Sequence, residues 1–96
     1  PYKPKTLVAT ALATDQISLS WVSGGDKGGS GTGGYRVYRN GILVGVTRSA
    51  SFIDTGLAAS TTYSYTVSAY DKASPTNAGL PTAPIIATTL DAPPLL

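Results

Sequence analysis

The feature that most constrains this chain is a strict alternation of apolar and polar side chains along two segments. Residues 16–21 carry an apolar side chain at every second position, ending at Trp21, and residues 63–69 repeat the pattern with Ser or Thr between. A period of two places the apolar side chains on one face of a strand. No window of ten or more residues carries the 3.6-residue period of an amphipathic helix. The alternation therefore predicts an antiparallel all-β domain.

Seven short segments have strand composition and are separated by turn residues. They are Thr6–Ala13, Ile17–Val22, Tyr35–Arg39, Ile42–Thr47, Ser51–Asp54, Thr62–Tyr70 and Pro84–Thr89. Asn40-Gly41 joins the third segment to the fourth and is a strong hairpin signal, because both central residues of a type I′ turn need a positive φ. Pro81 and Pro84 favour an edge position for the last strand, since proline has no N–H to donate. Seven such strands predict a β-sandwich.

The composition excludes several classes of function. The chain of 96 residues is one domain's worth, and it contains no His, Cys, Met or Glu. A zinc site of the usual His/Cys kind and a Ser-His-Asp or Cys-His nucleophile are therefore impossible. The net charge of +2 is too small for a nucleic-acid-binding surface. No run of 18 apolar residues is long enough to span a membrane.

Three segments fall outside the strand pattern. Residues 24–34 hold seven of the eleven glycines, which predicts a flexible, solvated loop between the second and third strands. The two ends are rich in proline, at residues 1 and 4 and again at 93 and 94. Such stretches are stiff and hard to bury, so we expect residues 1–4 and 91–96 to be linker stubs around a domain at residues 5–90.

Four motifs, in order along the chain, resemble fibronectin type III domains. The second strand, ending at Trp21, resembles the B strand of that family with its core tryptophan. Tyr35-x-Val37 followed by Tyr38-Arg39-Asn40-Gly41 resembles the C strand and the C–C′ turn. The E–F turn and F strand are matched by Asp54-Thr55-Gly56-Leu57 and then Thr61, Tyr63, Tyr65, Val67, Ala69 and Asp71, and the closing G strand by Thr88-Thr89. The resemblance covers about residues 4–90 and implies a seven-stranded, antiparallel, immunoglobulin-like β-sandwich.

The residues also indicate how such a sandwich would be held together. Leu57 and Tyr63 have the spacing of a tyrosine corner, in which a Tyr hydroxyl near the start of strand F bonds to backbone a few residues upstream. Trp21 is expected in the core. With Ile17 and Leu19 it should face the alternating apolar side chains of the other sheet, namely Tyr35, Val37, Tyr65 and Val67.

Three motifs that suggest other chemistry are weak. Asp54-Thr55-Gly56 matches the signature of aspartic proteases, but it lies past mid-chain and no apolar-apolar-Gly element follows it, so turn geometry is the better interpretation. The glycines at 29, 31 and 34 fit a dinucleotide fingerprint only formally, since a strand follows them instead of a helix. Asp26 is the one carboxylate in this loop, too few for a calcium ion that takes six to eight oxygens.

A candidate binding surface comes from side-chain parity. If Tyr35, Val37 and Ala69 point into the core, then Arg36, Tyr38 and Tyr70 point outward on neighbouring strands. Tyr and Arg are typical of binding surfaces. Tyr is also common at half-exposed positions of strands for structural reasons alone. We favour this structural interpretation over a binding surface.

No catalytic constellation survives, so we expect a non-catalytic module without cofactor or metal. The composition, rich in Ser, Thr, Ala and Gly and without Glu, resembles that of the fibronectin type III domains of bacterial extracellular polysaccharide-degrading enzymes. That resemblance implies a secreted, monomeric spacer, about 35 to 40 Å long, that positions catalytic and carbohydrate-binding domains of the same chain.

The alternative is a module that binds carbohydrate or protein through the C–F face or through the B–C and F–G loops. No nucleic acid or membrane partner is expected. An intrachain docking domain is a third hypothesis, favoured by an exposed apolar face.

Overall fold

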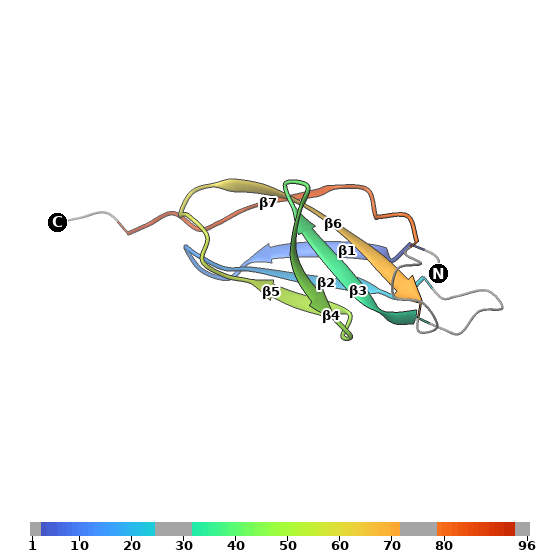
Figure 1. The fold of residues 1–96 in the computed structure, drawn as a ribbon. Helices are drawn as coiled ribbons and strands as arrows, with labels where there is room; N and C mark the ends of the chain where they lie inside the picture. The colour runs from blue at the N-terminus through green and yellow to red at the C-terminus, as the bar shows by residue number, and fades with distance from the viewer. Residues whose placement is uncertain (1–2, 25–31, 72–78, 94–96) are drawn as a thin grey trace.

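The computed structural model describes residues 3–24, 32–71 and 79–93. Its strands are β1 (Lys5–Ala11), β2 (Ile17–Val22), β3 (Thr32–Arg39), β4 (Ile42–Thr47), β5 (Ser51–Asp54), β6 (Thr62–Asp71) and β7 (Ile85–Thr88). They form two antiparallel sheets, ordered β1-β2-β5 and β4-β3-β6-β7, which pack face to face (Figure 1). The predicted seven-stranded β-sandwich is confirmed. Within these ranges there is no helix long and apolar enough to cross a membrane.

The bounds of β2, β4 and β5 match the prediction, but β3 begins three residues earlier, at Thr32. The predicted loop over residues 24–34 is therefore too long at its C-terminal end, and its residues 25–31 lie outside the described part of the chain. Gly34 pairs with Tyr70 of β6, and the Tyr70 ring occupies the space that a Cβ on Gly34 would need. Glycine here permits the close approach of a side chain; it does not mark a loop.

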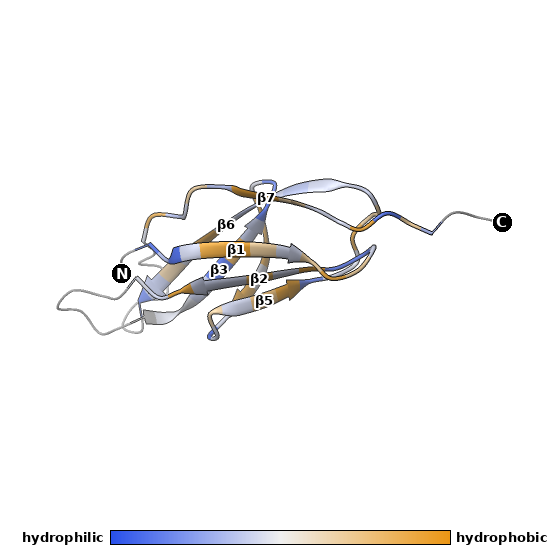
Figure 2. Cartoon of the chain, turned by 180° about the vertical axis from the view of Figure 1, so that it is seen from behind, coloured by the Kyte–Doolittle hydropathy of each residue, from blue (hydrophilic) through white to orange (hydrophobic). Residues whose placement is uncertain are grey.

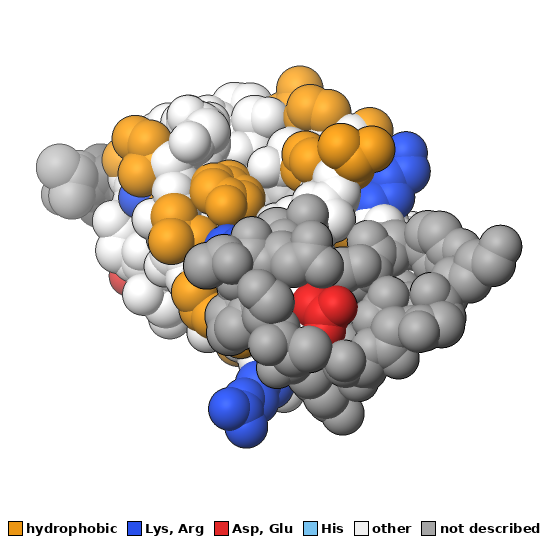
Figure 3. All heavy atoms as spheres, turned by 45° about the vertical axis from the view of Figure 1, so that its right-hand side comes forward, with side chains coloured by type: hydrophobic (Ala, Val, Ile, Leu, Met, Phe, Trp, Pro, Cys, Tyr) orange, Lys and Arg blue, Asp and Glu red, His pale blue; other side chains and the backbone are white. Residues whose placement is uncertain are grey.

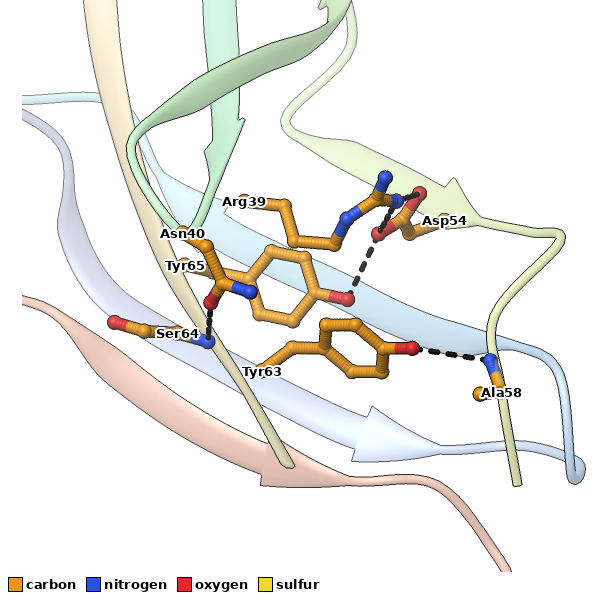
Figure 4. Close-up of polar contacts among 7 residues, drawn as sticks. All are labelled: Arg39, Asn40, Asp54, Ala58, Tyr63, Ser64 and Tyr65. Atoms are coloured by element: carbon orange, nitrogen blue, oxygen red, sulfur yellow. Dashed lines mark hydrogen bonds and ion pairs between the residues drawn. The ribbon is translucent and has the colours of Figure 1, made fainter. Parts of the chain in front are cut away.

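The predicted β3–β4 turn is confirmed. Asn40 and Gly41 have φ angles of 51° and 83°, and the pairing of Arg39 with Ile42 leaves these two residues alone as the loop. The turn is also fastened to β6. The Asn40 N–H donates to the Ser64 carbonyl at 2.7 Å, and the Ser64 N–H donates to Asn40 Oδ1 at 2.9 Å (Figure 4). The local turn chemistry and a contact to a distant strand thus favour the same geometry.

The core lies between the two sheets. Ten buried apolar residues form it: Ile17, Leu19, Trp21, Tyr35, Val37, Leu57, Tyr65, Val67, Ala69 and Ala87. The predicted facing of β2 against β3 and β6 is confirmed, and the Trp21 and Tyr35 rings meet edge to face with centroids 5.3 Å apart. Fully burying an aliphatic side chain such as Leu19 or Val37 stabilises the fold by roughly 1.5–3 kcal/mol. β7 lies at the edge of its sheet, as the prolines before it predict.

The two described ends of the chain lie at opposite ends of the sandwich (Figure 1). The principal-axis extents are 59 × 19 × 19 Å. The long axis exceeds the predicted 35 to 40 Å, because the chain continues past the end of β7 and away from the strands (Figure 1). The molecule is therefore a rod that separates its entry from its exit.

The outer face of the β1-β2-β5 sheet carries apolar side chains separated by serines. Val8 and Ile53 are 45% and 54% exposed, and Ser18 and Ser20 of β2 lie between their strands. Figure 2 views this sheet from outside, and its hydrophobic residues are interrupted by hydrophilic ones. The continuous apolar face that would favour a docking domain is not present among the described residues of this sheet.

Candidate functional site

The predicted surface residues lie on the outer face of the β4-β3-β6-β7 sheet. Arg36 and Tyr38 of β3 pair with Ser68 and Thr66 of β6, while their neighbours on β3 point into the core. The Cζ of Arg36 lies 5.1 Å from the centroid of the Tyr70 ring. The structure thus brings Arg36 and Tyr70 together and places Tyr38 on the same face. All three are half-buried.

The contacts of Tyr70 bear on what this face can recognise. The ring lies across Gly34 on one strand neighbour and against the Arg36 guanidinium, a cation–π contact worth about 0.5–1 kcal/mol at an exposed site. A ring engaged by its own domain is a poor stacking platform for a sugar. Tyr38 lies opposite Leu43 of β4, which is 49% exposed. Tyr38 therefore lies beside an exposed apolar side chain on this face.

Other apolar side chains on this face are dispersed. Val46 lies opposite Arg36, and Ile86 of β7 lies opposite Ser64. They are 57% and 67% exposed. Figure 3 shows hydrophobic side chains in separate clusters with polar surface between them. Dispersed apolar side chains are ordinary on a protein surface and do not by themselves indicate a partner.

A polar centre that sequence reasoning missed lies between the sheets (Figure 4). Arg39 Nη1 at the end of β3 donates to both carboxylate oxygens of Asp54 at 2.9 Å, and the Tyr65 hydroxyl of β6 donates to Asp54 Oδ2 at 2.8 Å. Asp54 ends β5, so its carboxylate joins the two sheets. The signal was available, because parity places Arg39 on the inward face with Val37, and an inward cation needs a partner.

The electrostatics of this centre follow from the same contacts. The hydrogen bond to Asp54 raises the pKa of Arg39, and burial raises the pKa of Tyr65, with the hydrogen bond to Asp54 adding to the effect. Arg39 is therefore charged and the Tyr65 hydroxyl neutral at physiological pH. Both carboxylate oxygens of Asp54 accept bonds from within the fold. This arrangement suits structural pairing of the sheets better than acid–base chemistry.

The pole at which β7 ends contains the predicted tyrosine-corner residues. The Ala58 N–H donates to the Tyr63 hydroxyl oxygen at 3.0 Å (Figure 4), and Leu57 is buried with its N–H donating to the Asp15 carbonyl. The turn between β5 and β6 is thereby fastened both to β6 and to the turn between β1 and β2. The polar groups at this pole hold turns in place.

Several predictions fall outside the described residues. They concern Asp26, the glycines at 29 and 31, and most of the F–G loop at residues 71–79. Among the described residues, no three His, Cys, Asp or Glu side chains come together as metal ligands.

The sandwich with its tyrosine corner matches one known family along most of its length. The model of the fibronectin type III domain matches residues 2–84. This chain belongs to the fibronectin type III family. The predicted resemblance is confirmed.

The relatives with similar sequences include bacterial polymer-degrading enzymes. Exoglucanase B of Cellulomonas fimi is 47% identical over 73 residues, which is 76% of this chain and 7% of that protein. Chitinase Chi52 of Paenibacillus xylanexedens is 44% identical over 76% of this chain and 14% of its own length. Poly(3-hydroxybutyrate) depolymerase of Ralstonia pickettii is 39% identical over 93% of this chain and 17% of its length. This fibronectin type III chain spans less than a fifth of each of these larger proteins.

Solved structures agree with the fold. The sixth fibronectin type III domain of human fibronectin type III domain containing protein 3 has a TM-score of 0.73 and 19% identity, and the match covers all of this chain and 92% of that one. At this identity the likeness concerns the fold alone.

Proposed function

We propose that this fibronectin type III domain is a non-catalytic spacer of a secreted, multidomain polysaccharide-degrading enzyme and positions the neighbouring domains of the same chain. Two of its relatives, an exoglucanase and a chitinase, support the substrate class. These relatives are much longer than this chain, which supports the proposal that the domain has neighbouring domains in the same chain. We further propose that residues 5–90 form the domain, that residues 1–4 and 91–96 are linker, and that the module is a monomer.

The observation that carries the proposal is the placement of the two described ends at opposite poles of a packed sandwich (Figure 1). Together with the chain that continues past β7, the long axis measures 59 Å. A flexible Gly/Ser chain of 96 residues would have a root-mean-square end-to-end distance of about 50–60 Å. The average reach is thus similar. The domain differs in the spread, because a coil also visits short separations and a packed sandwich does not. A fixed separation is what a spacer supplies.

The names of the relatives support spacing over recognition of one polymer. An exoglucanase, a chitinase and a poly(3-hydroxybutyrate) depolymerase are named for three chemically different polymers, one of them a polyester. A domain that bound one sugar chain would serve only some of these enzymes. A domain that holds other domains apart would serve all of them.

Small-angle X-ray scattering tests the proposal. Two identical folded reporter proteins are fused to the ends of this chain, and the control joins the same reporters with a Gly/Ser linker of equal residue number. We expect a resolved inter-reporter peak in the distance distribution for the domain and a smeared one for the linker. Equal spreads in the two fusions would contradict the spacer role.

The alternative is that Arg36, Tyr38 and Tyr70 bind a polysaccharide. The Tyr38–Leu43 pair is the feature that favours it. Retention of the isolated chain on insoluble cellulose, chitin and xylan tests it, with Tyr38→Ala and Tyr70→Ala as site variants and Ser20→Ala on the opposite sheet as the control. We expect no retention on any polymer. Retention that Tyr38→Ala or Tyr70→Ala abolishes and Ser20→Ala preserves would establish the binding role instead.

A further inference from the structure

The chain remains bonded to the domain after its last strand ends. Thr89, the residue after β7, is 3% exposed. Its N–H donates to the Thr61 carbonyl at 3.1 Å, and its hydroxyl accepts from the Thr61 N–H at 3.0 Å while donating to the Ala58 carbonyl at 2.6 Å. Three hydrogen bonds thus fasten one residue of the exit segment to the turn between β5 and β6.

The next two residues are held as well, and from two sides. The Leu90 N–H donates to the Ala13 carbonyl, in the turn between β1 and β2, and the Leu90 carbonyl accepts from the Ser60 N–H, each at 3.2 Å. The Ser60 hydroxyl donates to Asp91 Oδ1 at 2.7 Å. Because two different turns form hydrogen bonds with the exit segment, residues 89–91 cannot rotate about a single bond.

We infer that this set of contacts (Ala13, Ala58, Ser60, Thr61 and residues 89–91), here called the exit clamp, fixes the direction in which the chain leaves the domain. The inference rests on the proposed spacer function and deepens it, since a spacer that sets only a distance leaves its neighbour free to swing. Residue 91 then belongs to the rigid body, which moves the start of the C-terminal linker from residue 91, as proposed above from the sequence, to residue 92. The prolines at 93 and 94 limit the freedom of that linker.

The geometry of Ser60 supports a specific role in the clamp. Its φ of 52° lies in the left-handed region, which a residue other than glycine adopts at a cost. In this conformation its N–H and its hydroxyl serve consecutive residues of the exit segment, Leu90 and Asp91. The strain is offset by contacts whose function is to hold the exit.

Backbone ¹⁵N relaxation of the 96-residue chain tests the inference. Rigid backbone has an order parameter of about 0.85, and flexible backbone falls below about 0.6. We expect residues 89–91 to match β6 and β7, with order lost beyond residue 92. Asp91→Ala should lower the order parameter of residue 91 below about 0.6 and speed Leu90 amide exchange roughly two- to tenfold.

Two variants separate the clamp from general stability. Asp91→Asn keeps the Oδ1 acceptor and should keep wild-type order at residue 91. Thr62→Val removes the nearby hydroxyl contact of Thr62 with Thr88 and should leave the exit unchanged. Order parameters at residues 90 and 91 that are already below about 0.6 in the wild type would overturn the clamp and leave the spacer proposal standing. Ordered residues 90 and 91 together with a broad inter-reporter distance distribution would contradict the spacer proposal and leave the exit clamp standing.

Discussion

The pole where β7 ends and the outer face of the β4-β3-β6-β7 sheet use their polar side chains in opposite ways. At the pole, Tyr63 and Thr89 both bond to backbone groups of the turn between β5 and β6, and Asp54 joins the two sheets nearby. On the outer face, Arg36 contacts the Tyr70 ring, and its neighbours across the strands are the hydroxyl residue Ser68 and the exposed Val46. The polar groups at the pole hold its turns and the end of the chain in fixed positions. The difference indicates that this domain is built to hold its ends, and substitutions in the two regions can break or sharpen that contrast.

The largest effect is expected at Asp54. Asp54→Ala leaves the Arg39 guanidinium and the buried Tyr65 hydroxyl without their acceptor. Losing one partner of a buried ion pair costs about 3–5 kcal/mol. Because the Arg39 side chain is 30% exposed, we expect a loss of about 2–4 kcal/mol in the free energy of unfolding by urea. Asp54→Asn, which keeps an acceptor, should lose less. A change below about 0.5 kcal/mol for Asp54→Ala would show that the pair contributes nothing.

The next effect is expected at Thr89. Thr89→Val keeps the shape of the side chain and leaves the Thr61 N–H and the Ala58 carbonyl without this partner. We expect urea unfolding to require about 1–3 kcal/mol less free energy. Thr88→Val, one residue earlier and exposed, is the matched control and should change little. Equal losses in the two variants would contradict the special status of the pole.

The pH dependence of stability is expected to be smaller. The folded state raises the pKa of Tyr65 above its ordinary value of 10.0, so the unfolded chain ionises first. This contribution is complete below pH 10 and is lost as the pH rises above it. Between pH 9 and 11 we expect the free energy of unfolding to fall with rising pH, with a slope of at most about 1.4 kcal/mol per pH unit, the limit for one proton. Urea unfolding of Tyr65→Phe should lack this slope, and a parallel slope in both proteins would assign it to other groups.

The smallest effect is expected on the outer face. Arg36→Ala removes the cation–π contact with Tyr70, and the loss of this contact should lower the free energy of unfolding by about 0.5–1 kcal/mol. Arg36→Lys keeps a cation and should fall between the alanine variant and the wild type. A loss above about 2 kcal/mol would mean that this face is as important to the fold as the pole, and the contrast would disappear.

The sequence predicted the parts of the fold that depend on local patterns. Alternation placed β2, strand composition between turn residues placed β4 and β5, and Asn40-Gly41 predicted its turn, because these features depend on neighbouring residues. The start of β3 was missed, since the glycines suggested a loop and the covering Tyr70 ring comes from a distant strand. For Arg39, parity gave the inward direction, but its partner Asp54 lies on a strand of the other sheet, which no local pattern indicates. Parity placed Arg36 and Tyr70 on one face, but no local pattern indicated that they contact each other.

The distance between the two poles tests the central claim most directly. The chain has no cysteine, so Lys5→Cys at the start of β1 and Leu90→Cys in the exit clamp, two exposed positions, together attach one nitroxide label at each pole for a pulsed electron–electron distance measurement. We predict a single narrow distribution in the native protein, well separated from the broad one of the same sample unfolded in urea. A native distribution as broad as the unfolded one would contradict the account, because a domain that does not fix its ends cannot act as a spacer.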